Sequence, residues 1–226
     1  MNVERITIRG VSAAAAMTAV LLTAGCGTAG PETGSRPNIL YIMIDDLGWM
    51  DLRCQGNPAY RTPNIDRLAG QGMRFTDAYA AAPVCSPTRA AAMTGLAPAR
   101  LGITNHIPDR WRFYRDRELG PGRSVNYLAP EYVTVAERLK AAGYATAFMG
   151  KWHLAGTSWS DENRIYLPEN QGFDINIGGC HQGGPGGNGS FFDPYQVPNI
   201  PSRTKGRYLP DRLADEAVSF MKKQSE

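Results

Sequence analysis

The stretch that most restricts the fold is an unbroken apolar run that ends in two acids. Residues 39–44 read Ile-Leu-Tyr-Ile-Met-Ile, and Asp45 and Asp46 follow directly. The run shows no alternation of apolar and polar residues, which is typical of a strand buried on both faces in a parallel sheet. Open α/β sheets bind ligands at the carboxyl ends of their strands. The run therefore predicts an α/β fold with both acids at the ligand-binding edge of the sheet.

A helix that leads directly into a strand supports the same fold class. Thr134 and Glu137 have the spacing of a capping box, and the helix that they begin is expected to end near Gly143. The apolar residues 144–149 follow as a strand, which gives the second half of a βαβ unit and predicts parallel pairing. The carboxyl end of this strand is expected to lie at the same sheet edge as the two acids.

Two adjacent carboxylates at the end of a strand call for an explanation. Asp45 and Asp46 repel each other, and this repulsion raises a pKa unless a cation lies between them. A hard divalent ion with oxygen ligands, Ca²⁺ or Mg²⁺, is the natural partner. The alternative at this point is a solvated strand end or a helix cap.

Residues 85–89, Cys-Ser-Pro-Thr-Arg, combine a thiol, a helix start and an arginine. Pro87 suits the first turn of a helix, because its missing N–H costs nothing there. Cys85 is then expected just before the helix, where unpaired N–H groups and the helix dipole lower a thiol pKa and attract anions. Arg89 lies one turn further on the same side. The segment indicates a site for a negatively charged substrate; an ordinary helix start with a half-buried cysteine is the alternative.

Two further candidates follow the strand at 144–149. Lys151 can bind an anion as a point charge, and His153 can exchange protons near neutral pH. If the segment is extended, Lys151 and His153 share one side and Trp152 packs on the other. A surface strand end without a function remains the alternative.

The N-terminal segment is typical of an export signal. Residues 1–26 have a basic start, an apolar run, and the ending Leu-Thr-Ala-Gly-Cys. This ending resembles a bacterial lipoprotein cleavage site, in which Cys26 becomes the lipid-bearing first residue; plain secretion after cleavage nearby is the alternative. Residues 27–36 read as a polar linker. We therefore expect an exported protein, periplasmic or at the cell surface, with a lipid anchor at Cys26.

Composition excludes some classes and leaves others open. The formal net charge of the 226 residues is +3, with acids and bases nearly balanced, so nucleic-acid binding is not implied. The 25 glycines and 16 prolines predict long loops. The four cysteines are irregularly spaced and do not form a disulfide framework, although Cys54 and Cys180 could pair in an oxidising compartment.

Three segments together resemble the formylglycine-dependent (type I) sulfatase family. Residues 85–89 match its Cys-x-Pro-x-Arg signature, residues 150–154 (Gly-Lys-Trp-His-Leu) its second signature, and residues 38–48 its opening strand with the metal-binding acid pair. Residues 155–156 are Ala-Gly where members often carry Gly directly, a mild departure. The resemblance extends over residues 37–226.

The resemblance implies a fold and an extent. The fold is an alkaline-phosphatase-like α/β sandwich, in which helices flank a central, mostly parallel sheet. Family members are about twice as long as this chain. Residues 37–226 are therefore expected to be the N-terminal part of a catalytic domain that is incomplete at the C-terminus, and the chain alone is expected to bind metal poorly and to be weakly active or inactive.

The resemblance also assigns roles to the motif residues. A dedicated formylglycine-generating enzyme oxidises Cys85 to an aldehyde, whose hydrate is the nucleophile. Arg89 holds the formylglycine hydroxyl, Lys151 binds the sulfate, and His153 contacts the sulfate and takes a proton. Related enzymes bring a polar residue into the pocket near His181, which makes His181 a candidate substrate ligand; a flexible glycine-rich loop is the alternative.

The metal and the reaction follow from the same resemblance. Asp45, Asp46 and the modified Cys85 are the expected ligands of Ca²⁺, with Mg²⁺ as the other choice. The expected activity is hydrolysis of sulfuric esters, arylsulfatase-like, on a sulfated small molecule or glycan. The alternatives are a phosphate or phosphonate ester hydrolase of the same superfamily and a non-catalytic lipoprotein that binds glycans.

Overall fold

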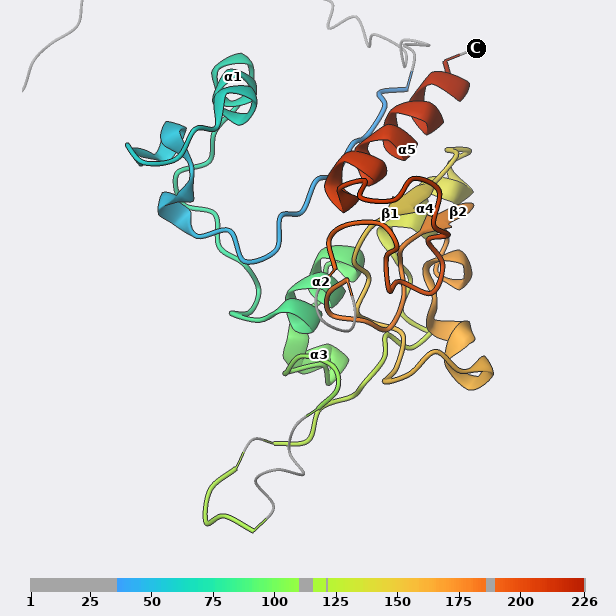
Figure 1. Cartoon of the computed structure of the whole chain (residues 1–226). Helices are drawn as coiled ribbons and strands as arrows, with labels where there is room; N and C mark the ends of the chain where they lie inside the picture. The colour runs from blue at the N-terminus through green and yellow to red at the C-terminus, as the bar shows by residue number, and fades with distance from the viewer. Residues whose placement is uncertain (1–35, 110–115, 121, 186–189, 226) are drawn as a thin grey trace, which may run out of the picture. The chain divides into compact units, whose positions relative to one another are not determined.

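A computed structural model describes residues 36–109, 116–120, 122–185 and 190–225 (Figure 1). The expected signal peptide with Cys26, and all of the expected linker except its last residue, lie outside the described residues. The chain divides into two units, one that ends at Ile44 and one that begins at Asp45.

The described part of the first unit contains the apolar run at 39–44, which forms no strand. The expected strand is not formed, since the structure assigns no strand to these residues.

Most of the regular secondary structure in the described part of the second unit is helical, and residues that favour helix ends stand at some of the boundaries. Helix α1 has Pro63 at its first position, and α2 ends at Gly95, which adopts a left-handed conformation with φ 71°. The α-helices are α1 (Pro63–Gln71), α2 (Cys85–Thr94), α3 (Pro98–Leu101), α4 (Val135–Ala141) and α5 (Leu209–Lys223). Short 3₁₀ helices cover Trp49–Asp51, Arg53–Gln55, Asp161–Tyr166 and Pro168–Asn170.

Two short strands form the sheet of the described residues. They are β1 (Ala147–Met149) and β2 (Ile175–Ile177), and they pair in parallel. Helix α4 leads into β1 as predicted, and its capping box is present: Glu137 N donates to Thr134 Oγ1 over 3.1 Å, and Thr134 N donates to Glu137 Oε2 over 2.7 Å. The pairing is parallel as predicted, but the partner of β1 is the later strand β2, and no described strand precedes α4 to complete the expected βαβ unit.

The main core surrounds the segment that follows β1. Trp152 is 1% exposed and Leu154 is 0% exposed, so the residues on either side of His153 are both anchored. Burial of such side chains is worth roughly 1.5–3 kcal/mol each. The rest of this core comes from α2, α3 and the loops between elements: Ala90, Met93, Leu101, Ile103, Ile107, Leu128, Ala155 and Leu167. The core therefore ties α2 to the chain at His153.

Two further observations apply to the described residues alone. None of their helices combines the length and the apolar character needed to cross a bilayer. Their three cysteines are all free thiols: Cys54, Cys85 and Cys180. Cys54 and Cys180 therefore do not form a disulfide in this structure.

Candidate active site

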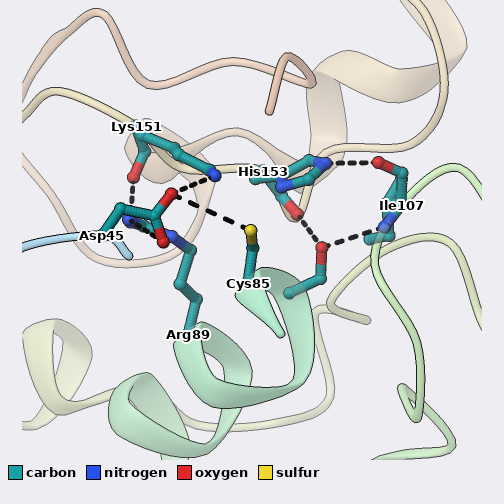
Figure 2. Close-up of polar contacts among 7 residues, drawn as sticks. Asp45, Cys85, Arg89, Ile107, Lys151 and His153 are labelled. Atoms are coloured by element: carbon teal, nitrogen blue, oxygen red, sulfur yellow. Dashed lines mark hydrogen bonds and ion pairs between the residues drawn. The ribbon is translucent and has the colours of Figure 1, made fainter. Parts of the chain in front are cut away.

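The carboxylate of Asp45 is the point where three separate segments of the second unit meet (Figure 2). Lys151 Nζ forms an ion pair with Asp45 Oδ2, and Arg89 Nη2 lies 3.6 Å from Asp45 Oδ1. The thiol of Cys85 donates to Asp45 Oδ2 over 3.8 Å. The structure therefore brings Asp45, Cys85, Arg89 and Lys151 together, although they lie up to 106 positions apart in the sequence.

Helix α2 presents both the thiol and the guanidinium. Cys85 is its first residue and Val84 is the N-cap, so the helix starts slightly earlier than the sequence indicated. Arg89 follows one turn later on the same face. Its side chain is only 11% exposed, and Nη1 also donates to the backbone carbonyl of Lys151. The arginine thus links α2 to the segment after β1 and holds its charge beside the thiol.

Two cations stabilise the ionised form of Asp45. Burial raises the pKa of this carboxyl, but the hydrogen bond and charge of Lys151 and the charge of Arg89 outweigh it. The pKa consequently lies below its usual value of 3.8. Asp45 is therefore a carboxylate at neutral pH, and its charge offsets only part of the positive charge around it.

Asp46 is placed differently from Asp45. It is exposed and has a left-handed backbone conformation with φ 56°, which is uncommon for a residue other than glycine. No described residue forms a hydrogen bond or ion pair with its side chain. His153, with φ 61°, is the other non-glycine residue of this kind among the described residues. Backbone strain of this type clusters at functional sites, and both residues belong to the predicted site.

The residues around Asp45 fit a hard divalent cation in chemistry but not in number. Asp45 and Asp46 offer carboxylate oxygens, the donors that Ca²⁺ and Mg²⁺ prefer. Within the described ranges, however, no group of three or more His, Cys, Asp or Glu side chains could hold an ion. The described residues alone therefore offer fewer donors than such an ion requires.

His153 is buried and does not lie in an extended segment. Strand β1 ends at Met149, and the positive φ of His153 turns the chain, so the prediction that Lys151 and His153 alternate along an extended strand is wrong. The ring Nε2 of His153 is hydrogen-bonded to the backbone carbonyl of Ile107 (Figure 2). Burial lowers the pKa of His153 to about 4, and the charges of Lys151 and Arg89 act in the same direction, against the hydrogen bond to Ile107. The ring is therefore neutral near pH 7.

Two residues next to His153 were missed by sequence reasoning. Ser86 is 0% exposed, and its hydroxyl bonds both to the backbone of His153 and to the backbone of Ile107. A serine inside the Cys-Ser-Pro-Thr-Arg motif was visible in the sequence, but its partners were not. Nothing in the sequence pointed to Ile107, because it acts through its backbone.

His181 lies near this region and contacts none of the other candidates through a hydrogen bond or ion pair. Its ring is beside that of Trp159, with centroids 6.4 Å apart, and burial lowers its pKa. The preceding carbonyl, of Cys180, accepts a hydrogen bond from His153 N over 2.9 Å. The structure therefore places the chain at His181, but not its side chain, against His153.

Three buried side-chain nitrogens in this part of the molecule have no hydrogen-bond partner among the described residues. They are Arg89 Nε, His153 Nδ1 and His181 Nδ1. Buried polar atoms are normally paired, so each of these is a candidate contact for a bound group. Arg89 Nε and Lys151 can donate to the oxygens of an anion beside the thiol of Cys85, whereas Nδ1 of a neutral His153 whose Nε2 is bonded to a carbonyl can only accept a proton or hydrogen bond.

Comparison with known sequences is consistent with this chemistry. A family described as Sulfatase matches residues 37–226. Mouse steryl-sulfatase is 42% identical over 165 residues, which cover 73% of this chain and 25% of that protein. Human arylsulfatase A is 41% identical, with coverages of 76% and 30%. Dog N-acetylgalactosamine-6-sulfatase is 38% identical, with coverages of 91% and 39%. The chain thus spans well under half the length of these relatives.

Solved structures give the fold. The structure of Ps i-CgsB in complex with k-i-k-neocarrahexaose has a TM-score of 0.61 and 31% sequence identity; the match covers 80% of this chain and 40% of that one. Bacteroides fragilis yidJ has a TM-score of 0.63 at 24% identity, with coverages of 86% and 43%. The predicted alkaline-phosphatase-like α/β fold is confirmed, with this chain forming part of such a domain.

Proposed function

The chain belongs to the sulfatase family, and on that premise we propose that it serves in the hydrolysis of sulfate esters, with Cys85 as the source of the nucleophile. One observation carries the proposal: Cys85 and Arg89 of α2 and Lys151 after β1 converge on Asp45 (Figure 2). A cysteine that served only as an ordinary helix start would not need two buried or nearly buried cations beside it. Cys85 itself is partly exposed, which leaves it accessible to a modifying enzyme.

The side chains have distinct roles in the proposed reaction. Cys85, oxidised to formylglycine by a generating enzyme, presents a hydrated aldehyde, and one hydroxyl attacks the sulfur as the alcohol leaves. Arg89 donates to that hydroxyl and offsets its charge. Lys151 binds the sulfate and the leaving oxygen, where negative charge develops.

His153 completes the cycle. It takes the proton of the second hydroxyl, so that the aldehyde returns as the C–O bond to sulfate breaks and sulfate leaves with the electron pair. The neutral ring is in the correct protonation state to accept a proton. The charge of a bound sulfate would raise the pKa of His153 from about 4 toward the working pH, because a nearby anion favours the protonated ring.

Asp45, Asp46 and the modified Cys85 would hold a divalent ion, Ca²⁺ or Mg²⁺. When bound, the ion supplies positive charge that stabilises the sulfate oxygens and lowers the pKa of the nucleophile. Asp45 already lies among two cations, so its carboxylate is ionised and ready to bind. His181, with its unpartnered Nδ1, is proposed as a further contact to the substrate.

The proposed substrate is a sulfated small molecule or glycan. The names of the relatives include both kinds, a steryl-sulfatase and an N-acetylgalactosamine-6-sulfatase.

We also propose that residues 1–26 export the protein to the periplasm or cell surface, and that Cys26 carries a lipid anchor. A Cys26→Ser variant that is released from membranes while the original chain is retained would support the anchor.

The test compares an aryl sulfate with an aryl phosphate after co-expression with the generating enzyme. We expect hydrolysis of the sulfate to exceed that of the phosphate, and we expect Cys85→Ala to abolish it. Cys54→Ala is the matched control, because this half-buried free cysteine has its hydrogen bonds with Asp66 and Arg74, which are not candidate site residues. A preference for phosphate would support the related phosphate or phosphonate hydrolases. Glycan binding that survives Cys85→Ala, with no hydrolysis, would support a non-catalytic protein.

A further inference from the structure

We propose that Ser86 and Ile107 are positioning residues that hold His153 in one tautomer, so that Nδ1 is the nitrogen that works in the site. This proposal rests on the proposed function, since it names the atom of His153 that would take the proton. The observation that supports it is a closed cycle of hydrogen bonds among three buried residues, Ser86, Ile107 and His153.

The hydroxyl of Ser86 makes two bonds at once. It accepts from Ile107 N over 3.0 Å and donates to the backbone carbonyl of His153 over 3.0 Å. A serine hydroxyl has one donor hydrogen, so donation to His153 leaves only acceptor capacity for Ile107 N–H. Ser86 is next to Cys85. Helix α2 therefore carries, at adjacent positions, the source of the nucleophile and the hydroxyl that positions His153.

The carbonyl of Ile107 then determines the tautomer. A carbonyl can only accept, so His153 Nε2 must carry the hydrogen in their mutual bond. A neutral imidazole has one N–H, and Nδ1 is consequently the acceptor. Nδ1 is buried and has no partner among the described residues. Figure 2 shows Ile107 at one edge of the ring, and Nδ1 belongs to another edge.

The backbone and one glycine fix the ring further. His153 N donates to the carbonyl of Cys180 over 2.9 Å, and the residue itself has a φ of 61°. A Cβ built at Gly183 would lie 2.6 Å from His153 Cε1, so no larger residue fits without displacement of the ring. His153 is therefore held on its backbone, on Nε2 and on Cε1, and Nδ1 is the remaining polar atom.

The direct test is a nitrogen-15 spectrum of the side chains of this chain with Cys85 unmodified. The sequence has three histidines, and a His153→Gln variant identifies the signal of His153. We expect the shifts of an Nε2–H tautomer near pH 7. Shifts of an Nδ1–H tautomer, or of an equal mixture, would overturn the proposal without any further variant. This result does not depend on turnover or on maturation, so it stands even if the proposed function fails.

Variants then test the role of Ser86. In Ser86→Ala we expect His153 to populate both tautomers; Ser86→Cys, which keeps a weak donor and acceptor, should retain more of the Nε2–H form and serves if the alanine variant does not fold. Thr94→Ala is the matched control, because it also removes a hydroxyl from α2 but one that bonds to Ala90 O within the helix. Identical spectra for Ser86→Ala and the unmodified chain would contradict the role.

Steady-state kinetics distinguish a positioning role of Ser86 from a general effect of its substitution on folding. With the formylglycine content of each preparation measured by mass and used for normalisation, we expect Ser86→Ala to lower kcat about tenfold with KM little changed, because a misplaced base slows proton transfer but not binding. Unchanged kcat, or a change in KM alone, would count against Ser86. Thr94→Ala should leave both constants unchanged.

Discussion

Lys151 and Lys140 are two lysines with carboxylate partners and very different surroundings. Lys151 is paired with Asp45, with a side chain that is 17% exposed, beside a second cation and the candidate nucleophile. Lys140 is paired with Asp174 at 2.6 Å, and its side chain is 51% exposed. Exposed ion pairs such as Lys140–Asp174 contribute little to the free energy of unfolding. A fixed charge in a partly buried site, such as that of Lys151, acts strongly on a bound anion.

We therefore expect Lys151→Met to lower kcat/KM for an aryl sulfate by about 10²-fold or more, since it removes positive charge from the developing leaving group. Lys140→Met should change this value by less than about threefold. The measurement is steady-state hydrolysis by the matured protein. Equal effects of the two substitutions would contradict the role given to Lys151.

His153 makes stability depend on pH in a definite direction. Its pKa in the folded chain is about 4, against 6.5 as the ordinary value. Above pH 6.5 both states are neutral, and the residue contributes no pH dependence. As the pH falls below 6.5 the unfolded chain binds a proton first, so the free energy of unfolding decreases until about pH 4, by about 3 kcal/mol in total.

The check is urea unfolding of the original chain and of His153→Gln at pH 7 and pH 5. Between these values the original chain should lose about 2 kcal/mol more than the variant. His181, whose pKa is also lowered by burial, is present in both chains and cancels in the comparison. A pH dependence that is the same in both chains would show that His153 is not buried as a neutral ring.

At the scale of the elements, Gly183 of the glycine-rich loop after β2 lies against the ring of His153. Gly183 packs on the ring of His153, whereas an added Cβ at Gly184 would meet nothing within 4 Å. We expect Gly183→Ala to shift the side-chain nitrogen signals of His153 and to lower kcat, because the new methyl group must displace the ring. Gly184→Ala is the matched control and should do neither; a similar effect of both would mean that the loop acts only through its general stability.

The elements also show which parts of the fold could be predicted. Helices α1, α2 and α4 carry their own signals, namely Pro63, Pro87 and the Thr134–Glu137 capping box, and local signals suffice for local structure. Residues 39–44 could not be predicted in the same way, because burial of a strand depends on partners that a local pattern does not contain.

The candidate site shows the same division. Its chemistry-bearing side chains were identified from residue types next to predicted element ends: Asp45, Cys85, Arg89 and Lys151. The hydrogen bonds that position His153 were not identified from the sequence. They involve the hydroxyl of Ser86 in α2 and the backbone of the loop at Ile107. The turn at His153 was missed because a positive φ in a residue other than glycine has no sequence signal.

At the scale of the whole molecule, the described residues contain two adjacent acids at the site and no group of three metal-binding side chains. Since Ca²⁺ usually takes six to eight oxygen ligands, we expect this chain to bind it weakly. Calorimetric titration should give a dissociation constant in the range of roughly 10⁻⁴ M or weaker. Asp46→Asn should weaken it further; affinity that is tight and insensitive to Asp46→Asn would place the ion elsewhere.

The central proposal for the whole molecule is that Cys85 is oxidised to formylglycine and that Arg89 and Lys151 lie beside it, where the sulfate binds. The most direct measurement is the mass of the peptide containing Cys85, taken from a preparation that hydrolyses an aryl sulfate after co-expression with the generating enzyme. We expect the mass of an aldehyde in place of the thiol, in a fraction that rises with the activity. An active preparation in which Cys85 is entirely an unmodified thiol would contradict it.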